Sequence, residues 1–296
     1  MNEVAAPTVS IVIRCRDEAA SLGPVLDAIF AQDRSPDFEV IALDSGSRDG
    51  TLDVLRRYAV RLECAPAESF SYGRALNRGA ALARGAIVVY VSAHSRPLSA
   101  RWLAALVAPF AARNVVATFG RQVPVPGVNP IEAIATARNF PPAAPAGVRF
   151  STANGALRRQ AALARPFDEE VAIAEDHLWA CAAPDGGVVY VPEAVVGHSH
   201  PMTLAHWRSR FYAHGLASQY ARRRLGVELP WDTPGVTAPG VALRRALPFL
   251  RLARTLARSG ELRALGRLPV YALARTVWYT RGLRDGAVRY ATPKSV

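Results

Sequence analysis

The sequence predicts an α/β protein with a doubly wound, mainly parallel sheet, followed by a basic helical C-terminal region. Three observations support this fold class. Short apolar, β-branched runs alternate with segments whose apolar residues recur at helical spacing, the order typical of parallel strands joined by crossover helices. Polar loops follow several of the predicted strands, and the chain after His200 is rich in arginine and helical in pattern.

Each early element follows from a local pattern. The run Val9–Ile13 is mostly β-branched, as in a buried parallel strand. The next segment has apolar residues at helical spacing, and Ser21 is suited to cap that helix. The same alternation predicts strands over residues 38–43, 60–63, 87–91 and 188–192, and helices over residues 21–32, 51–58 and 74–83.

The later elements are less regular. Residues 120–147 are rich in proline, alanine and glycine, which predicts a long irregular crossing, whereas Phe167–Ala182 indicates an acid-rich loop followed by a helix. Proline interrupts helices, so we expect the arginine-rich helices after His200 to be broken at five positions. These are Pro230, Pro234, Pro239, Pro248 and Pro269.

The charge divides the chain into two parts. Of the 296 residues half are hydrophobic and a fifth charged, which excludes a disordered or collagen-like chain. The net charge is +12, but residues 201–296 carry 17 basic and four acidic residues, whereas residues 1–200 carry 19 and 20. We therefore expect a nearly neutral domain over residues 1–200 and a basic amphipathic helical region over residues 201–296.

Cysteine content and hydropathy bear on location. Cys15, Cys64 and Cys181 are too few and too scattered for a disulfide framework, which favours a reducing compartment. The N-terminus lacks the pattern of a signal peptide, and no apolar run is long enough for a transmembrane helix. The expected location is cytoplasmic.

Three loops are the candidate binding loops. Ligands of open parallel sheets bind beyond the carboxyl ends of the strands, where the sequence places Arg14–Glu18, Asp44–Gly50 and Ser92–Pro97. A carboxylate at Asp44, held by a turn of small residues, suits hydrogen bonding to a base or a ribose. The alternative is an Asx-type turn that precedes the next helix.

Four segments together resemble family 2 glycosyltransferases with the GT-A fold, over roughly residues 8–200. They are Val9–Ile13, Arg16–Glu18, Asp44–Thr51 and Gly73–Gly85, and Phe70–Arg74 also resembles rhamnosyltransferase-like members. The resemblance implies that Glu18 contacts the donor's ribose and Asp44 its base, with Arg16 and Ser45 nearby. Arg74 would face the diphosphate; the alternative is a solvated arginine at a helix start.

The resemblance also marks a departure at the metal site. The family has Asp-any-Asp after the fourth strand, where this chain has Ser92-Ala93-His94. Losing both carboxylates weakens a site for a hard cation such as Mg²⁺. His94 could still bind a softer metal such as Mn²⁺, or donate to a phosphate, and Arg96 could supply positive charge in place of a metal. His198 stands where a histidine completes the coordination sphere in metal-dependent relatives.

A second acidic motif supplies the candidate base. Glu175-Asp176 matches the pair that provides the base in inverting family members, and Asp176 would deprotonate the acceptor hydroxyl. The alternative is that both acids only stabilise a helix N-terminus. The resemblance places Asn154, Gly155 and Trp179 on the acceptor side.

These features predict an inverting glycosyltransferase that moves a sugar from a UDP- or dTDP-linked donor to a glycan or lipid-linked acceptor in cell-surface polysaccharide synthesis. The alternative is a catalytically silent nucleotide- or glycan-binding homologue that lacks the metal site. The basic region suits an anionic membrane at the inner face, or else packs on the catalytic body. Nucleic acid is not an expected partner, because no such binding motif is present.

Overall fold

The computed structural model describes residues 8–33, 35–143, 150–200, 203–229, 231 and 241–291. The chain forms two compact units. The first comprises the chain up to Val125, Ala137–Glu170 and Glu175–Ser199; the second comprises Pro126–Thr136, Val171–Ala174 and the chain from His200 onward.

The first unit is built on a mixed sheet in the order β3-β2-β1-β4-β7-β6-β8-β5. Strands β1 to β4 are parallel, β7 is antiparallel to β4 and β6, and β6 is parallel to β8. The α/β fold class is confirmed. The strands are β1 (Val9–Cys15), β2 (Phe38–Asp44), β3 (Val60–Cys64), β4 (Ile87–Ser92), β5 (Arg96–Pro97), β6 (Ala117–Val123), β7 (Asn154–Arg158) and β8 (Val188–Gly197).

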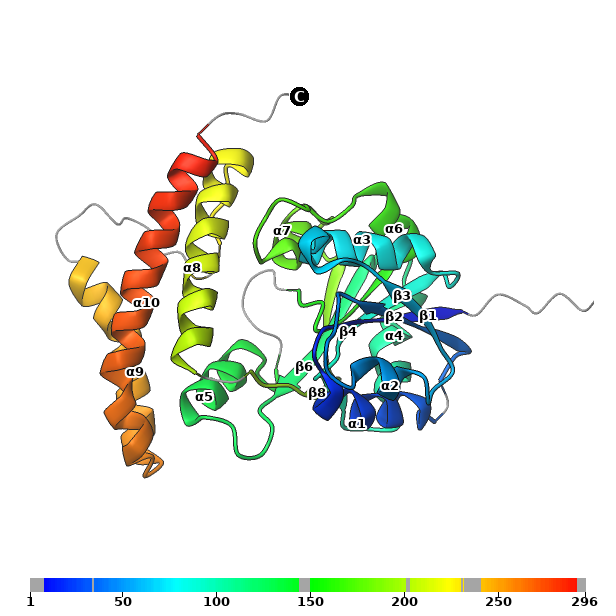
Figure 1. The fold of residues 1–296 in the computed structure, drawn as a ribbon, viewed down its shortest axis with the longest axis horizontal. Helices are drawn as coiled ribbons and strands as arrows, with labels where there is room; N and C mark the ends of the chain where they lie inside the picture. The colour runs from blue at the N-terminus through cyan, green and yellow to red at the C-terminus, as the bar shows by residue number, and fades with distance from the viewer. Residues whose placement is uncertain are drawn as a thin grey trace, which may run out of the picture. The chain divides into compact units, whose positions relative to one another are not determined.

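Helices cover both faces of this sheet (Figure 1). The residues Leu22, Leu26 and Trp102 pack on one face, and Leu76, Ala162 and Trp179 on the other. Burial of both faces explains why β1 and β4 are almost continuously apolar. The first face is covered by α1 (Ala19–Phe30), α2 (Thr51–Leu55) and α4 (Trp102–Val107), and the second by α3 (Tyr72–Leu82), α6 (Arg159–Ala164) and α7 (Glu175–Cys181). Short 3₁₀ turns lie at Ala67–Ser69 and Ala108–Ala111.

The second unit is helical and has a core of its own, which includes Ile131, Trp207, Phe211, Leu256 and Leu268. None of the described helices is long and apolar enough to cross a bilayer. The helices are α5 (Pro130–Asn139), which begins in this unit, α8 (Leu204–Tyr220), a π-helical turn (Ala221–Leu225), α9 (Val241–Arg258) and α10 (Leu262–Arg289).

Glycines bring α8 and α10 into backbone contact. A Cβ atom on Gly215 would lie 2.3 Å from the Tyr279 carbonyl oxygen, and one on Gly282 would lie 2.2 Å from that of Tyr212. Neither carbonyl can move without distorting its helix, so the pairing requires glycine at both positions.

The structure corrects several expectations about individual elements. Helix α9 continues through Pro248 and α10 through Pro269, so these prolines do not end helices; Pro230, Pro234 and Pro239 lie outside the described residues. Packing of α10 in the bundle offsets the one hydrogen bond that Pro269 removes. Residues 120–147 are not wholly irregular, because they include the end of β6 and all of α5. Ser21 lies inside α1, one turn after the cap position at Glu18.

Candidate active site

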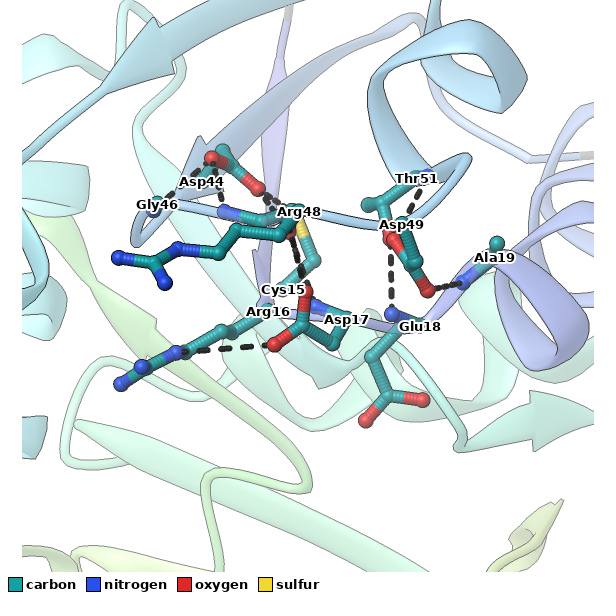
Figure 2. Close-up of polar contacts among 11 residues, drawn as sticks. Cys15, Arg16, Asp17, Glu18, Ala19, Asp44, Gly46, Arg48, Asp49 and Thr51 are labelled. Carbon is teal, nitrogen blue, oxygen red and sulfur yellow. Dashed lines mark hydrogen bonds and ion pairs between the residues drawn. The ribbon is translucent and has the colours of Figure 1, made fainter.

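Two loops interlock at the carboxyl ends of β1 and β2 (Figure 2). The carboxylate of Asp44 accepts hydrogen bonds from the Gly46 and Ser47 amides, at 3.0 Å each, and from the Ser47 hydroxyl. The Asp17 amide donates to the Ser47 hydroxyl at 2.9 Å, and the Arg48 amide donates to the Asp17 carboxylate at 2.7 Å. Asp44 therefore forms the Asx-type turn that we considered, and its loop is fastened to the loop after β1.

The same two loops are joined again at the start of α1. The Glu18 amide donates to the Thr51 hydroxyl at 2.7 Å, and the Ala19 amide donates to Asp49 at 3.0 Å. Gly46, with a φ of 81°, has the left-handed backbone that allows the turn. These contacts give the Asp44–Gly50 loop a defined shape before any ligand binds.

The Glu18 carboxylate, in the loop after β1, contacts His94, in the loop after the neighbouring strand β4. Its Oε1 lies 2.7 Å from the His94 Nδ1, and the Ser21 hydroxyl donates to the other oxygen. Burial raises the pKa of Glu18, but the hydrogen bond and charge of His94 and the Ser21 hydroxyl outweigh it, so the pKa lies below its usual value. An ionised carboxylate only accepts hydrogen bonds, so the His94 Nδ1 is the donor.

His198, at the end of β8, has a matching arrangement. Its Nδ1 lies 2.7 Å from the Gln122 Oε1, and the Gln122 amide group donates to the Ser151 hydroxyl at 2.9 Å. The Gln122 oxygen therefore faces the ring, and the His198 Nδ1 donates to it. The His94 and His198 rings stack with centroids 5.0 Å apart and an interplanar angle of 10°.

The imidazoles of His94 and His198 suit a divalent cation of borderline softness. In the neutral form of each imidazole with Nδ1 carrying the proton, Nε2 holds the lone pair that a metal binds, and oxygen acceptors behind the rings are the usual support for such ligands. One nitrogen of each ring lies within 4.8 Å of one on the other ring. Imidazole suits Mn²⁺ or later metals better than Mg²⁺, which prefers oxygen ligands.

The pair Glu175-Asp176 opens α7, and its two carboxyl groups have different surroundings. Asp176 is half-buried, and its oxygens accept from the Thr152 amide at 3.0 Å and the His177 amide at 2.7 Å. Glu175 is buried, 3.7 Å from the Arg14 guanidinium. Arg14 also donates to the Thr152 hydroxyl at 3.3 Å, which links both acids to the end of β1.

The surroundings of Glu175 also change its pKa. Burial, and next the charge of Asp176, raise the pKa of Glu175 to about 8, although the Arg14 guanidinium opposes the shift. At neutral pH Glu175 is therefore mostly protonated. Asp176, in contrast, is only half-buried, and two backbone amides hold its carboxylate in place.

The α3 segment serves mainly to place the acidic loop before α7. A Cβ on Gly73 would lie 2.2 Å from the Asp168 carbonyl oxygen, so α3 approaches that loop as only glycine allows. The Asn77 side chain donates to the Phe167 carbonyl at 2.9 Å and accepts from the Phe167 amide at 2.8 Å. Arg74, predicted to face a diphosphate, pairs with Glu169 at 3.1 Å and is about half exposed.

The remaining predicted site residues divide into buried and exposed groups. Asn154 is fully buried, accepting from the Trp102 indole at 2.9 Å and donating to the Ala194 carbonyl at 2.9 Å. Trp179 lies in the core, its indole donating to the Arg165 carbonyl. A Cβ on Gly155 would lie 2.5 Å from the Ser151 carbonyl oxygen. Ser45 is buried, Ser92 half-buried, and Arg16 and Arg96 exposed.

The sequence did not single out Arg14, Thr152 or Gln122. Arg14 lay within a candidate loop, but nothing in the sequence showed that it would face Glu175. Gln122 lies on β6, a strand that the sequence pattern did not predict because it contains polar and small residues. Gln122 contacts His198, 76 residues away, and Thr152 contacts Asp176, 24 residues away. Local sequence patterns do not reveal contacts at such separations.

Comparisons with known proteins identify the family of this chain. The family model described as "Glycosyl transferase family 2" matches residues 10–160, which is about half of the chain. The chain belongs to glycosyl transferase family 2. It is accordingly a glycosyltransferase, and the predicted family resemblance is confirmed; its rhamnosyltransferase-like branch is a finer prediction, which the match does not address. No curated protein sequence matches the chain.

Solved structures share the fold of this family 2 glycosyltransferase. The mannosyltransferase of Pyrobaculum calidifontis, in complex with GDP-mannose and Mn²⁺, has a TM-score of 0.57 and 23% identity, and 97% of this chain covers 88% of that one. Mannosyl-3-phosphoglycerate synthase from Rubrobacter xylanophilus has a TM-score of 0.56 and 20% identity, with 79% of each chain covered. Glucosyl-3-phosphoglycerate synthase from Mycobacterium tuberculosis, with Mn²⁺, UDP-glucose and phosphoglyceric acid, has a TM-score of 0.54 and 19% identity, and the match covers 76% of this chain and 81% of that one. The GT-A fold is thereby confirmed.

Proposed function

We propose that this glycosyltransferase moves a sugar from a nucleotide diphosphate donor, UDP- or dTDP-linked, to a hydroxyl of a glycan or lipid-linked acceptor, with inversion at the anomeric carbon. We place the reaction in cell-surface polysaccharide synthesis and the protein at the inner face of the membrane. Family membership supports the reaction class. Structural neighbours that hold GDP-mannose or UDP-glucose support a nucleotide-sugar donor.

The observation that carries the proposal is the position of Asp176. Thr152 precedes β7 by two residues, and β7 pairs with β4 so that Asn154 lies opposite Val91. The Thr152 amide holds Asp176, and the Thr152 hydroxyl accepts from Arg14, at the end of β1. The half-buried carboxylate therefore lies at the same sheet edge as the loops after β1 and β4, where ligands of such sheets bind.

The chemistry assigned to Asp176 is general base catalysis. Its carboxylate takes the proton of the acceptor hydroxyl as that oxygen forms its bond to the anomeric carbon. The bond from the anomeric carbon to the phosphate oxygen breaks on the opposite side, and the nucleoside diphosphate leaves with the electron pair. Glu175 keeps its proton at neutral pH, so it does not compete for this task.

The donor side depends on Asp44 and Glu18. Asp44 shapes the loop proposed to meet the base. Glu18 was expected at the ribose, but its carboxylate is bonded to His94 and Ser21, so we propose that it acts on the donor through His94. Arg74 and Arg96 are the proposed cations that contact the diphosphate. Arg74 must first break its ion pair with Glu169 to do so.

His94 and His198 are the proposed ligands of a divalent metal, Mn²⁺ in preference to Mg²⁺. Such an ion neutralises charge on the donor diphosphate and on the departing nucleotide when bound. The neighbours with bound Mn²⁺ support a metal in this family. Within this chain, Glu18 and Gln122 orient the two imidazoles.

Calorimetry combined with a turnover assay tests the proposal against a catalytically silent homologue. UDP-, dTDP- and GDP-linked sugars are titrated with Mn²⁺, with Mg²⁺ and with chelator, and release of nucleoside diphosphate is followed in parallel. We expect one donor to bind and to be hydrolysed or transferred. Binding without any release across donors and acceptors would instead support the silent homologue.

A further inference from the structure

The second unit has an apolar surface stripe on α10 that its own core does not use. Leu262, Val270, Leu273 and Val277 are 71%, 50%, 65% and 47% exposed. At about 100° per residue these positions fall within an arc of about 80°. Val288 lies on the same arc and is 80% exposed. We call these five residues the α10 stripe.

The opposite face of α10 is already occupied. Ala264, Leu268 and Ala274 are buried in the core of the second unit, and Gly282 contacts the backbone of α8. In Figure 1 the long helix α10 runs alongside α8 within this unit. The core of the second unit therefore forms without the stripe residues, and packing within this unit does not explain why these exposed positions are apolar.

Several other apolar residues of α9 and α10 pack inward. Leu256 is fully buried, and Phe249, Leu252 and Trp278 pack against the same core. The exposed apolar surface is formed by aliphatic residues of α10 instead.

Arginines border the stripe. Arg263, Arg267 and Arg284 are exposed and lie on or beside the same arc, and within the part of the chain that the structure describes none of the three forms an ion pair. The sequence of α10 contains six arginines and a single acid, Asp285, which is bonded to Tyr212 and 3.8 Å from Arg281. The stripe is therefore an apolar surface with a positively charged margin.

We propose that the α10 stripe docks this protein on the surface of an anionic phospholipid bilayer, with the helix lying in the plane of the interface. Aliphatic side chains enter the acyl boundary while the arginines beside them contact lipid phosphates. From Leu262 to Val288 the stripe is about 39 Å long, which suits a helix lying on a surface. None of the described helices crosses a membrane, so docking would be peripheral.

Charge argues against a second copy of the chain as the occupant. Two copies joined through this stripe would bring the arginine-rich margins of two α10 helices together, with only Asp285 on each as a countercharge. Like charges brought together oppose association. An anionic lipid surface has the opposite charge, and it accommodates both the stripe and its margin.

The test is co-sedimentation of the full chain with vesicles of phosphatidylcholine, with or without about one-third phosphatidylglycerol. We expect binding to the anionic vesicles to exceed binding to neutral ones by about tenfold or more, and to weaken at high salt. The variant Leu273→Gln/Val277→Gln is expected to bind about tenfold more weakly, and Arg263→Gln/Arg267→Gln likewise. Helicity by circular dichroism should be unchanged, because all four side chains are exposed.

Matched controls come from the first unit. Leu163→Gln removes an aliphatic side chain that is 42% exposed, and Arg101→Gln/Arg113→Gln removes two exposed arginines; both should bind vesicles as the wild type does. The proposal is overturned if the wild type does not bind anionic vesicles, or if the stripe variants bind equally well. Sedimentation velocity that shows a dimer dissociated by Leu273→Gln/Val277→Gln would assign the stripe to a second copy instead.

Discussion

Two adjacent carboxyl groups at the start of α7 illustrate how surroundings divide similar residues. Glu175 is buried beside Arg14, whereas Asp176 is half-buried and held by two backbone amides. Burial and the neighbouring charge raise the pKa of Glu175 and keep the proton on it at neutral pH. Adjacent acids of one site thus differ in burial and in hydrogen-bond partners.

Glu175 makes stability depend on pH in a defined direction. Its pKa rises from an ordinary 4.5 to about 8 in the native protein. Between these values the native state binds more protons than the unfolded chain, so the wild type loses stability as pH rises from about 4.5 to about 8. We expect Glu175→Gln to remove this dependence and to unfold with a free energy about 1–3 kcal/mol higher than the wild type at pH 8.

Urea unfolding of both proteins at several pH values measures the difference. The two should converge below pH 4.5, where Glu175 becomes protonated in both states. Parallel stability curves for the variant and the wild type would show that Glu175 ionises normally in the native protein.

The carboxylate of Glu18 is predicted to support metal binding through His94. Replacing it with alanine removes the acceptor for Nδ1, and loss of such partners weakens metal affinity by about 10–100-fold. Glu18→Gln keeps an amide oxygen as acceptor and should lose much less. Electron paramagnetic resonance of free Mn²⁺ in the presence of nucleoside diphosphate reports the affinity without an activity assay. Equal affinity of Glu18→Ala and wild type would remove Glu18 from the metal site.

Candidate site residues could be proposed from the sequence where a local motif identified them. Asp44, His94, Asp176 and His198 could be chosen because they follow strands or begin a helix at recognisable motifs. Their contacts could not be predicted, because these join distant segments: Glu18 reaches His94, 76 residues away. Asn154 was predicted to lie on the acceptor side of the site. Its side chain is instead buried in the core, where it accepts a hydrogen bond from the indole of Trp102.

At the scale of elements, the contact of α8 with α10 depends on missing side chains. Gly282→Ala would place a methyl group 2.2 Å from the Tyr212 carbonyl oxygen. We expect the variant to lose about 1–3 kcal/mol of stability, as overpacked sites do. Gly266 is the matched control on the same helix, since a Cβ there meets nothing within 4 Å.

Thermal unfolding followed by circular dichroism compares the two variants. Gly266→Ala should be neutral or stabilise α10 by about 0.5–1 kcal/mol, because alanine favours helix more than glycine does. Equal effects of the two substitutions would show that α8 and α10 do not pack through Gly282.

Elements were predictable where local patterns matched the final burial. Strands β1, β2 and β4 are apolar runs largely covered on both faces, and the patterns located these three and the more exposed β3. β6 and β7 were missed because Gly120, Gln122 and Asn154 interrupt their apolar character, although tertiary contacts bury all three residues. The continuation of α10 through Pro269 has the same origin, because packing overrides a local helix breaker.

At the scale of the whole molecule, charge and chemistry lie in different parts of the chain. The first 200 residues are nearly neutral and contain the family match, whereas the last 96 carry the excess of arginine. The net charge of +12 therefore bears on a docking partner and not on the reaction. Transfer and docking should be separable, so the α10 stripe variants are expected to retain activity toward soluble substrates.

The central claim is that Asp176 is the base of a nucleotide-sugar transferase. The most direct measurement compares donor affinity by calorimetry with the rate of sugar transfer for Asp176→Asn, using Asp185→Asn, an exposed acid of the same unit, as control. We predict unchanged donor affinity and a rate lowered about 10²–10⁴-fold for Asp176→Asn alone. Full transfer by Asp176→Asn would contradict this account.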